Sequence, residues 1–178
     1  MEVKLLDIKI NHKIPLAYYA LATNLKDYIC ENTVIVCIGT DKFIGDSLGP
    51  LVGSILKENN FPLPVYGTID NPIHALNIDS KIKEIKNSHK DSLIIGIDAC
   101  LGLRESIGEI HIRDYPIRPG KGVGKTLQSV GDISLVGIVD SNDNTDFFSS
   151  RSIRLSLIYN IAKTISYGFI HAYHLNFH

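Results

Sequence analysis

Residues 33–50 read TVIVCIGTDKFIGDSLGP, which joins an apolar run to a short polar loop and then to an amphipathic segment. The run from Thr33 to Gly39 is β-branched and almost uninterruptedly apolar, the pattern of a central strand covered on both faces. Asp46 is expected to open a helix that ends near Asn59. These residues therefore predict one strand–loop–helix unit of an α/β sheet.

A second apolar strand ends in an acidic residue in the same way. Residues 92–98 read SLIIGID, and Asp98 leads into the short segment 99–102, ACLG. In an open α/β sheet, the carboxyl ends of parallel strands form the crevice where ligands bind. Two carboxylates in one such crevice can share a proton, hold a metal ion or activate a water molecule. We therefore expect Asp46 and Asp98 to meet in one pocket.

The rest of the chain alternates between helical and strand patterns. Helices are expected at 14–30, 71–87 and 148–167, and strands at 65–68, 108–113 and 133–139. Asn71 and Pro72 look like the cap and first turn of the second helix, and the tail 172–178 is expected to fray or to pack at the surface. The pattern predicts one domain over residues 1–178, with a doubly wound, largely parallel sheet between two helical layers.

Composition limits the classes of partner. Of the 178 residues, 44% are hydrophobic and 21% charged, as in an ordinary soluble domain. A formal charge of -1 gives no basic footprint, so no nucleic acid partner is expected. No apolar run is long enough to span a bilayer, and no signal peptide is readable, so we expect a protein without membrane contact. Three cysteines without a CxxC pair favour a reducing compartment. Of these, Cys37 and Cys100 are expected to serve packing.

Each aspartate also has a purely local explanation. Asp46 can be the N-cap of its helix, a role that is compatible with chemistry because a helix N-terminus favours the ionised carboxylate. Asp98 can cap a turn, although burying a carboxylate alone is costly. The sequence leaves both explanations open beside the functional one.

A glycine-rich loop and the histidines offer weaker signals. The loop 118–125 lacks the spacing of a Walker A motif, so it is expected to be a lid or to lie near the site. The histidines form no convincing metal set: His74 is expected in a first helical turn, and His111 alternates on a strand. The closely spaced histidines lie in the C-terminal tail: His171, His174 and His178.

The combined motifs are similar to those of a known group of proteins. The chain resembles the YyaC-type sporulation proteins of spore-forming bacteria, which are similar to the spore germination protease and, more distantly, to the HybD-type maturation peptidases of nickel hydrogenases. The resemblance covers about residues 30–165 and rests on these segments: 38–40, 45–50, 96–101, 119–124 and 130–134.

This resemblance implies a three-layer α/β/α sandwich of the phosphorylase/hydrolase-like type. In the germination protease, two aspartates at these motif positions are thought to carry peptide hydrolysis, and they correspond to Asp46 and Asp98. Substrate-binding residues are expected in the same motifs: Gly39, Thr40, Asp41, Ser47, Gly120, Gly122 and Gly124. In the hydrogenase peptidases, the matching carboxylates and a histidine bind nickel. Here the residue at 46 is Asp rather than Glu, as in the germination protease. No histidine stands at a convincing position for the third ligand, and His111 is the nearest candidate. This departure from the pattern weakens a nickel-dependent mechanism.

The resulting expectation is a cytoplasmic, sporulation-associated peptidase, in the mother cell or the forespore. One carboxylate would act as base toward a water molecule while the other, protonated, polarises the scissile carbonyl, and the loop from Gly120 to Gly124 would steady the oxyanion. Small acid-soluble spore proteins are the candidate substrates, no cofactor is required, and homo-oligomer formation stays open. Two alternatives remain: an inactive relative that binds a peptide or protein without cutting it, and a hydrolase with a divalent metal ion at Asp46 and Asp98.

Overall fold

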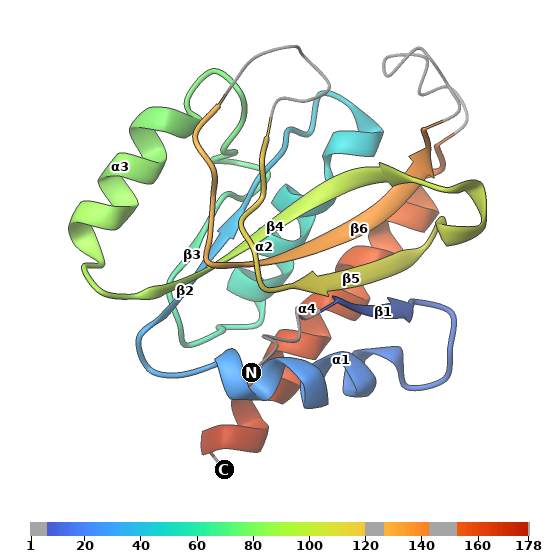
Figure 1. Cartoon of the computed structure of the whole chain (residues 1–178), viewed down its shortest axis with the longest axis horizontal. Coiled ribbons are helices and arrows are strands. Elements are labelled where there is room, and N and C mark those ends of the chain that lie inside the picture. The colour runs from blue at the N-terminus through green and yellow to red at the C-terminus, as the bar shows by residue number, and fades with distance from the viewer. Residues whose placement is uncertain (1–6, 120–126, 143–152, 178) are drawn as a thin grey trace, which may run out of the picture.

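The chain is built around one six-stranded sheet, seen in a computed structural model that describes residues 7–119, 127–142 and 153–177 (Figure 1). The strand order is β1-β5-β6-β4-β2-β3. The strands are β1 (Asp7–Asn11), β2 (Thr33–Cys37), β3 (Val65–Tyr66), β4 (Leu93–Gly102), β5 (Glu109–Arg113) and β6 (Ile133–Ser141). The pairs β2–β3, β2–β4 and β4–β6 are parallel, whereas β5 and β1 are added in antiparallel pairs. The sheet is therefore mostly parallel, as predicted.

Helices cover both faces of this sheet. The longer helices are α1 (Ala17–Leu25), α2 (Leu48–Glu58), α3 (Ile78–Ser88) and α4 (Leu155–Phe177). The short 3-10 turns are η1 (Lys26–Tyr28), η2 (Ile44–Asp46) and η3 (Arg104–Ser106). Helices α1, α2 and α4 share one apolar cluster with the sheet, and α3 shares a second cluster with the opposite face. The structure thus confirms the three-layer α/β/α sandwich.

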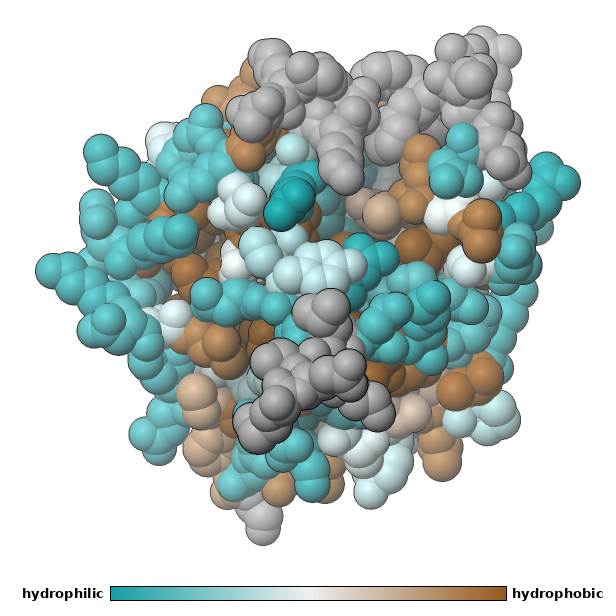
Figure 2. Space-filling model, in the orientation of Figure 1, coloured by the Kyte–Doolittle hydropathy of each residue, from teal (hydrophilic) through white to brown (hydrophobic). Residues whose placement is uncertain are grey.

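Burial explains why the central strands are readable from sequence. Every residue of β2 is buried, so its apolar run needs no alternation. Cys37 is fully buried there and packs as a small apolar residue, as predicted. In contrast, α3 buries only Ile78, Ile82 and Ile85. Hydrophilic side chains dominate its outer surface, on the left of Figure 2.

The predicted start of α3 is wrong. The helix begins at Ile78 rather than at Asn71, and its N-cap is Asn77. Ile73 instead forms a parallel bridge with Ile38, and its carbonyl accepts the Gly39 N–H at 2.8 Å. Residues before the helix therefore continue the sheet beyond β2, because backbone pairing there outweighs the local signal of an Asn-Pro helix start. His74 consequently precedes the helix and is not in its first turn.

The C-terminal helix also differs from the prediction. Helix α4 begins at Leu155, and residues 148–152 of the predicted helix lie outside the described residues. The helix continues to Phe177, so of the two expectations for the tail, fraying is wrong and packing at the surface is confirmed. Ala172 is fully buried, Tyr173 packs edge-on to Phe61 at 5.9 Å between ring centroids, and residues 174–176 are exposed.

Strand β1 was not predicted. It is a five-residue edge strand whose burial varies from exposed to buried, and its partner β5 is about a hundred residues away in sequence.

Several boundaries move by a few residues. Helix α1 covers only the middle of the predicted range 14–30, and β3 stops at Tyr66, before Gly67 with its φ of 86°. Strand β4 runs to Gly102, so Asp98 lies inside a strand and does not end it. Strand β6 likewise extends to Ser141.

Candidate functional site

A tight loop returns Asp46 to the end of β2. The backbone N–H of Thr40 donates to the Asp46 carbonyl at 3.0 Å, which closes the loop 40–46. Gly39 has a φ of 139°, and a Cβ built there would lie 2.0 Å from the Asp46 carbonyl oxygen. Only glycine fits this close approach. Asp46 ends the turn η2 and the N-cap of α2 is Ser47, so the interpretation of Asp46 as N-cap is wrong.

Asp98 lies in β4, the strand next to β2. Its cross-strand partner on β6 is Val136, and η2 contacts β4, which brings Asp46 to the same region of the sheet. The Asp98 side chain accepts the Ala99 N–H at 2.8 Å. Asp98 is only partly exposed, so its carboxyl group has lost some of the hydrogen bonds to water that it makes in the unfolded chain. The Ala99 N–H replaces one of them.

Burial changes the pKa of both carboxyl groups, and the charge of Asp46 also changes that of Asp98. Burial raises the pKa of Asp46 to about 6, although the Thr40 N–H acts in the opposite direction. Burial also raises the pKa of Asp98 well above its usual range, the negative charge of Asp46 raises it further, and the Ala99 N–H opposes both effects. The two carboxyl groups are thus close enough to interact. Burial and the charge of Asp46 therefore both favour the protonated form of Asp98.

The other predicted site residues fall into four groups. Gly39 shapes the loop, as described above. Thr40 and Asp41 belong to the same loop. Thr40 Oγ1 accepts the Lys42 N–H at 3.3 Å, whereas the Asp41 side chain is exposed. Ser47 is buried and donates its hydroxyl to the Ile44 carbonyl at 2.7 Å, so it stabilises η2. Gly120, Gly122 and Gly124 lie outside the described residues.

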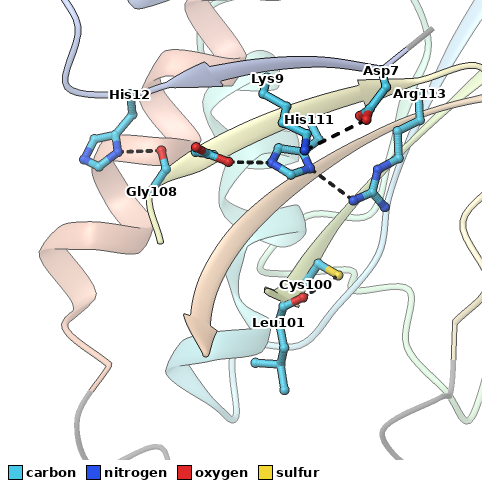
Figure 3. Close-up of polar contacts among 9 residues, drawn as sticks. Asp7, Lys9, His12, Cys100, Leu101, Gly108, His111 and Arg113 are labelled. Atoms are coloured by element: carbon cyan, nitrogen blue, oxygen red, sulfur yellow. Dashed lines mark hydrogen bonds and ion pairs between the residues drawn. The ribbon is translucent and has the colours of Figure 1, made fainter. Parts of the chain in front are cut away.

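Two residues beside the pair were not predicted to act there. Cys100 lies two residues after Asp98 on the same face of β4, and Arg113 reaches it from β5 (Figure 3). Burial raises the pKa of the Cys100 thiol, the nearby Arg113 guanidinium lowers it, and the charge of Asp98 raises it again. The thiol therefore lies between an acid and a cation. The alternation of β5 was visible in sequence, but nothing local indicated which strand β5 would join.

The donor set around the pair bears on a divalent ion. His111, the nearest candidate for a third ligand, has both ring nitrogens engaged, with Glu109 at 2.8 Å and Arg113 at 3.2 Å. Register aligns His111 with Val136 and Val136 with Asp98, so His111 lies two strands from Asp98, about 10 Å. Within the described ranges, no three or more His, Cys, Asp or Glu side chains form a metal-binding group. In the described part of the chain, the residues around Asp46 and Asp98 do not fit the nickel centre of the hydrogenase peptidases.

None of the helices in the described part of the chain has the length and apolar character needed to cross a membrane.

The chain matches one family model and is similar to a curated protein. A family model described as "Protein of unknown function (DUF1256)" matches residues 9–168, which include both aspartates and all six strands except the first two residues of β1. The chain is also 42% identical over 149 residues to "Uncharacterized protein YyaC" of Bacillus subtilis (strain 168), covering 83% of this chain and 73% of that protein. This protein is therefore a member of the DUF1256 family and a YyaC-type protein.

Proposed function

We propose that this protein is a peptidase that hydrolyses a peptide bond with Asp46 and Asp98. The observation that carries the proposal is that η2 and β4 bring two acidic side chains to one region of the sheet, close enough that the charge of Asp46 raises the pKa of Asp98. With a pKa of about 6, Asp46 is mostly ionised at pH 7, whereas burial and the charge of Asp46 favour the protonated form of Asp98. Pairs of acids with separated pKa values supply a base and an acid at one pH.

The chemistry follows from this assignment. Asp46 accepts a proton from a water molecule, and the resulting hydroxide attacks the scissile carbonyl carbon. Asp98 donates its proton to the carbonyl oxygen as negative charge develops there. When the intermediate collapses, the C–N bond breaks, the proton held by Asp46 passes to the leaving nitrogen, and Asp98 regains its own proton. Both carboxyl groups end in their starting states.

The substrate and the setting are inferred from likeness. The motifs resemble those of the spore germination protease, and the chain has a Bacillus relative, so small acid-soluble spore proteins are the first substrates to test. The cytoplasm of a sporulating cell is the corresponding compartment. Bulk charge agrees with a protein or peptide partner, since a net charge of -1 provides no general attraction for nucleic acid.

Cleavage by single variants tests the proposal. Asp46→Asn and Asp98→Asn should each lower the rate of cleavage by at least about a hundredfold, because each removes one of the two proton transfers. The measurement is fragment formation from purified small acid-soluble spore proteins by mass spectrometry. Asp27→Asn is the matched control, since Asp27 is exposed in η1, and it should cut at the wild-type rate.

The outcomes separate the alternatives. Cleavage retained by both variants would refute the pair as the catalytic centre. A stable complex without fragments, seen with the wild-type protein, would show that the chain binds without cutting. Activity that disappears with chelator and returns with a divalent ion would show a metal-dependent hydrolase.

A further inference from the structure

Arg113 is held in a fixed orientation on β5. Its Nη2 donates to His111 Nδ1 at 3.2 Å, and its guanidinium carbon lies 5.7 Å from the centroid of the Tyr115 ring. The side chain is half-buried, and Figure 3 shows its guanidinium beside the His111 ring. A guanidinium held from several sides presents its remaining N–H groups in one direction.

The hydrogen bonds of His111 explain how that orientation is maintained. Arginine can only donate, so His111 Nδ1 must be the acceptor, and its proton is on Nε2. That N–H donates to Glu109 Oε2 at 2.8 Å. Glu109, His111 and Arg113 are alternate residues of β5 and share one face, so they form a continuous chain of hydrogen bonds. Glu109 and His111 are positioning residues for Arg113.

Arg113 lacks an anionic partner in the described structure. None of the ion pairs among the described residues includes it: the three pairs are Lys9–Asp7, Lys81–Glu84 and His111–Glu109. Asp7 is the cross-strand neighbour of Arg113, but its carboxylate lies 3.9 Å from Lys9 Nζ instead. A half-buried cation without an anion is costly, and a ligand that brings a carboxylate would remove that cost.

Arg113 also lies on the face of the sheet that carries Asp98. The row His111–Val136–Asp98 crosses three neighbouring strands, so His111 and Asp98 project from the same face of the sheet. Arg113 turns back toward His111 and reaches the Cys100 thiol, which the charge of Asp98 also influences. The Cys100 thiol is therefore influenced both by the Arg113 cation and by Asp98.

We propose that Arg113 is a carboxylate-binding subsite of the Asp46–Asp98 site, held in place by His111 and Glu109. The inference rests on the proposed function for the nature of the ligand, which is a peptide. The planar guanidinium of Arg113 can donate two parallel N–H···O hydrogen bonds to a carboxylate. The carboxylate comes from an acidic side chain next to the bond to be cut or from the free carboxyl end of the peptide.

Binding of matched peptides tests this subsite without requiring turnover. The probes are three peptides: pentaalanine capped at both ends with a central Glu, the same peptide with a central Gln, and pentaalanine with a free carboxyl end. Calorimetry on the wild-type protein should show the Glu peptide or the free-end peptide binding about tenfold or more tightly than the Gln peptide, as expected for one charged hydrogen-bonded pair. Which of the two binds identifies the source of the carboxylate.

Variants connect that preference to Arg113. In Arg113→Met, the preference for a carboxylate should fall to within about twofold, and Arg113→Lys should retain part of it because the charge remains but the fork does not. Arg104→Met, at an exposed arginine in η3, should bind like the wild type. Equal binding of all three peptides to the wild type, or an undiminished preference in a folded Arg113→Met, would overturn the subsite.

Peptide integrity after the titration separates this inference from the proposed function. A carboxylate-dependent complex with uncut peptides, together with intact spore proteins in the cleavage assay, would contradict the peptidase proposal and support the subsite. Cleavage without any preference for a carboxylate would support the peptidase and contradict the subsite.

Discussion

The position of Asp98 in the fold destabilises the ionised form of its carboxyl group. Burial of its carboxyl group and the nearby charge of Asp46 both disfavour the ionised form. A group with a raised folded-state pKa binds its proton more tightly in the folded chain than in the unfolded chain. The unfolded pKa is near 3.8, so the cost of ionisation is absent below that pH and grows as pH rises from there toward the folded pKa.

Replacing this ionisable group by a neutral one should stabilise the protein, because the unfolded chain then no longer gains from ionising it. Asp98→Asn is expected to raise the free energy of unfolding at pH 7 by about 1 kcal/mol or more, or roughly 2–4 °C in Tm. At pH 3 the gain should vanish, because the wild-type carboxyl group is then protonated in both states. Thermal unfolding at the two pH values measures the difference. A variant that is less stable than the wild type at pH 7 would contradict the electrostatic account.

The sequence alone identified some of the candidate site residues and missed others. Asp46 and Asp98 were recognisable because each comes after an apolar run in the sequence and resembles a motif position. Arg113 was not, because its importance depends on β5 joining β6 in an antiparallel pair, which brings it to Cys100. A residue whose role arises from a contact across strands has no local signal in the sequence.

Among the elements, the loop between β2 and α2 determines where Asp46 lies. Gly39 and Gly49 let backbone approach backbone: a Cβ at Gly49 would lie 2.1 Å from the Ile38 carbonyl oxygen. These contacts fix the start of α2 against the end of β2. The loop positions Asp46 through the backbone, without help from the Asp46 side chain as a cap.

Gly39→Ala should displace η2. The new Cβ meets the Asp46 carbonyl, and the φ of 139° is unfavourable for alanine, so we expect a loss of about 1–3 kcal/mol and of most cleavage activity. Gly45→Ala in the same loop is the control, since its Cβ would meet only the end of the Ile153 side chain, at 2.8 Å. Chemical unfolding and the cleavage assay measure both effects. A Gly39→Ala protein with wild-type stability and activity would show that the loop is not constrained as described.

The elements also show where local reasoning fails. The Asn-Pro pair at 71–72 satisfies the rules for a helix start, yet the chain there pairs Ile73 with Ile38 beside β2. The apolar spacing of α3 from Ile78 onward was correctly identified. Periodicity therefore predicted the helix itself, and tertiary hydrogen bonds decided its first residue.

On the scale of the whole molecule, α4 closes the layer that contains α1 and α2. Phe169 on α4 is fully buried and lies edge-on to Phe61, with 6.3 Å between ring centroids. Gly168 lets α4 approach α1, since a Cβ there would be 2.5 Å from Leu21 Cδ2. The C-terminal turns of α4 therefore belong to the core.

Phe169→Ala should be strongly destabilising. We expect a loss of about 3–5 kcal/mol, because a large cavity opens between α4 and Phe61. Urea unfolding measures it, with Leu175→Ala as the control, since Leu175 is exposed on the same helix. A loss below about 1 kcal/mol would mean that the C-terminal turns of α4 pack loosely.

The overall architecture was more predictable than its edges. Alternation of strands and helices predicted the three layers, because a parallel sheet needs a helix in most crossovers. The antiparallel addition of β5 and β1 was not predicted, since the order of strands depends on pairings between segments far apart in sequence.

The most direct measurement is an NMR titration of the carboxyl carbons of Asp46 and Asp98 in the wild-type protein and in Asp46→Asn. The account predicts that Asp46 titrates near pH 6, that Asp98 titrates at higher pH than Asp46, and that Asp46→Asn lowers the pKa of Asp98. Two independent titrations near pH 4, unaffected by the substitution, would show that the carboxyl groups are separate and hydrated, and would contradict the shared site.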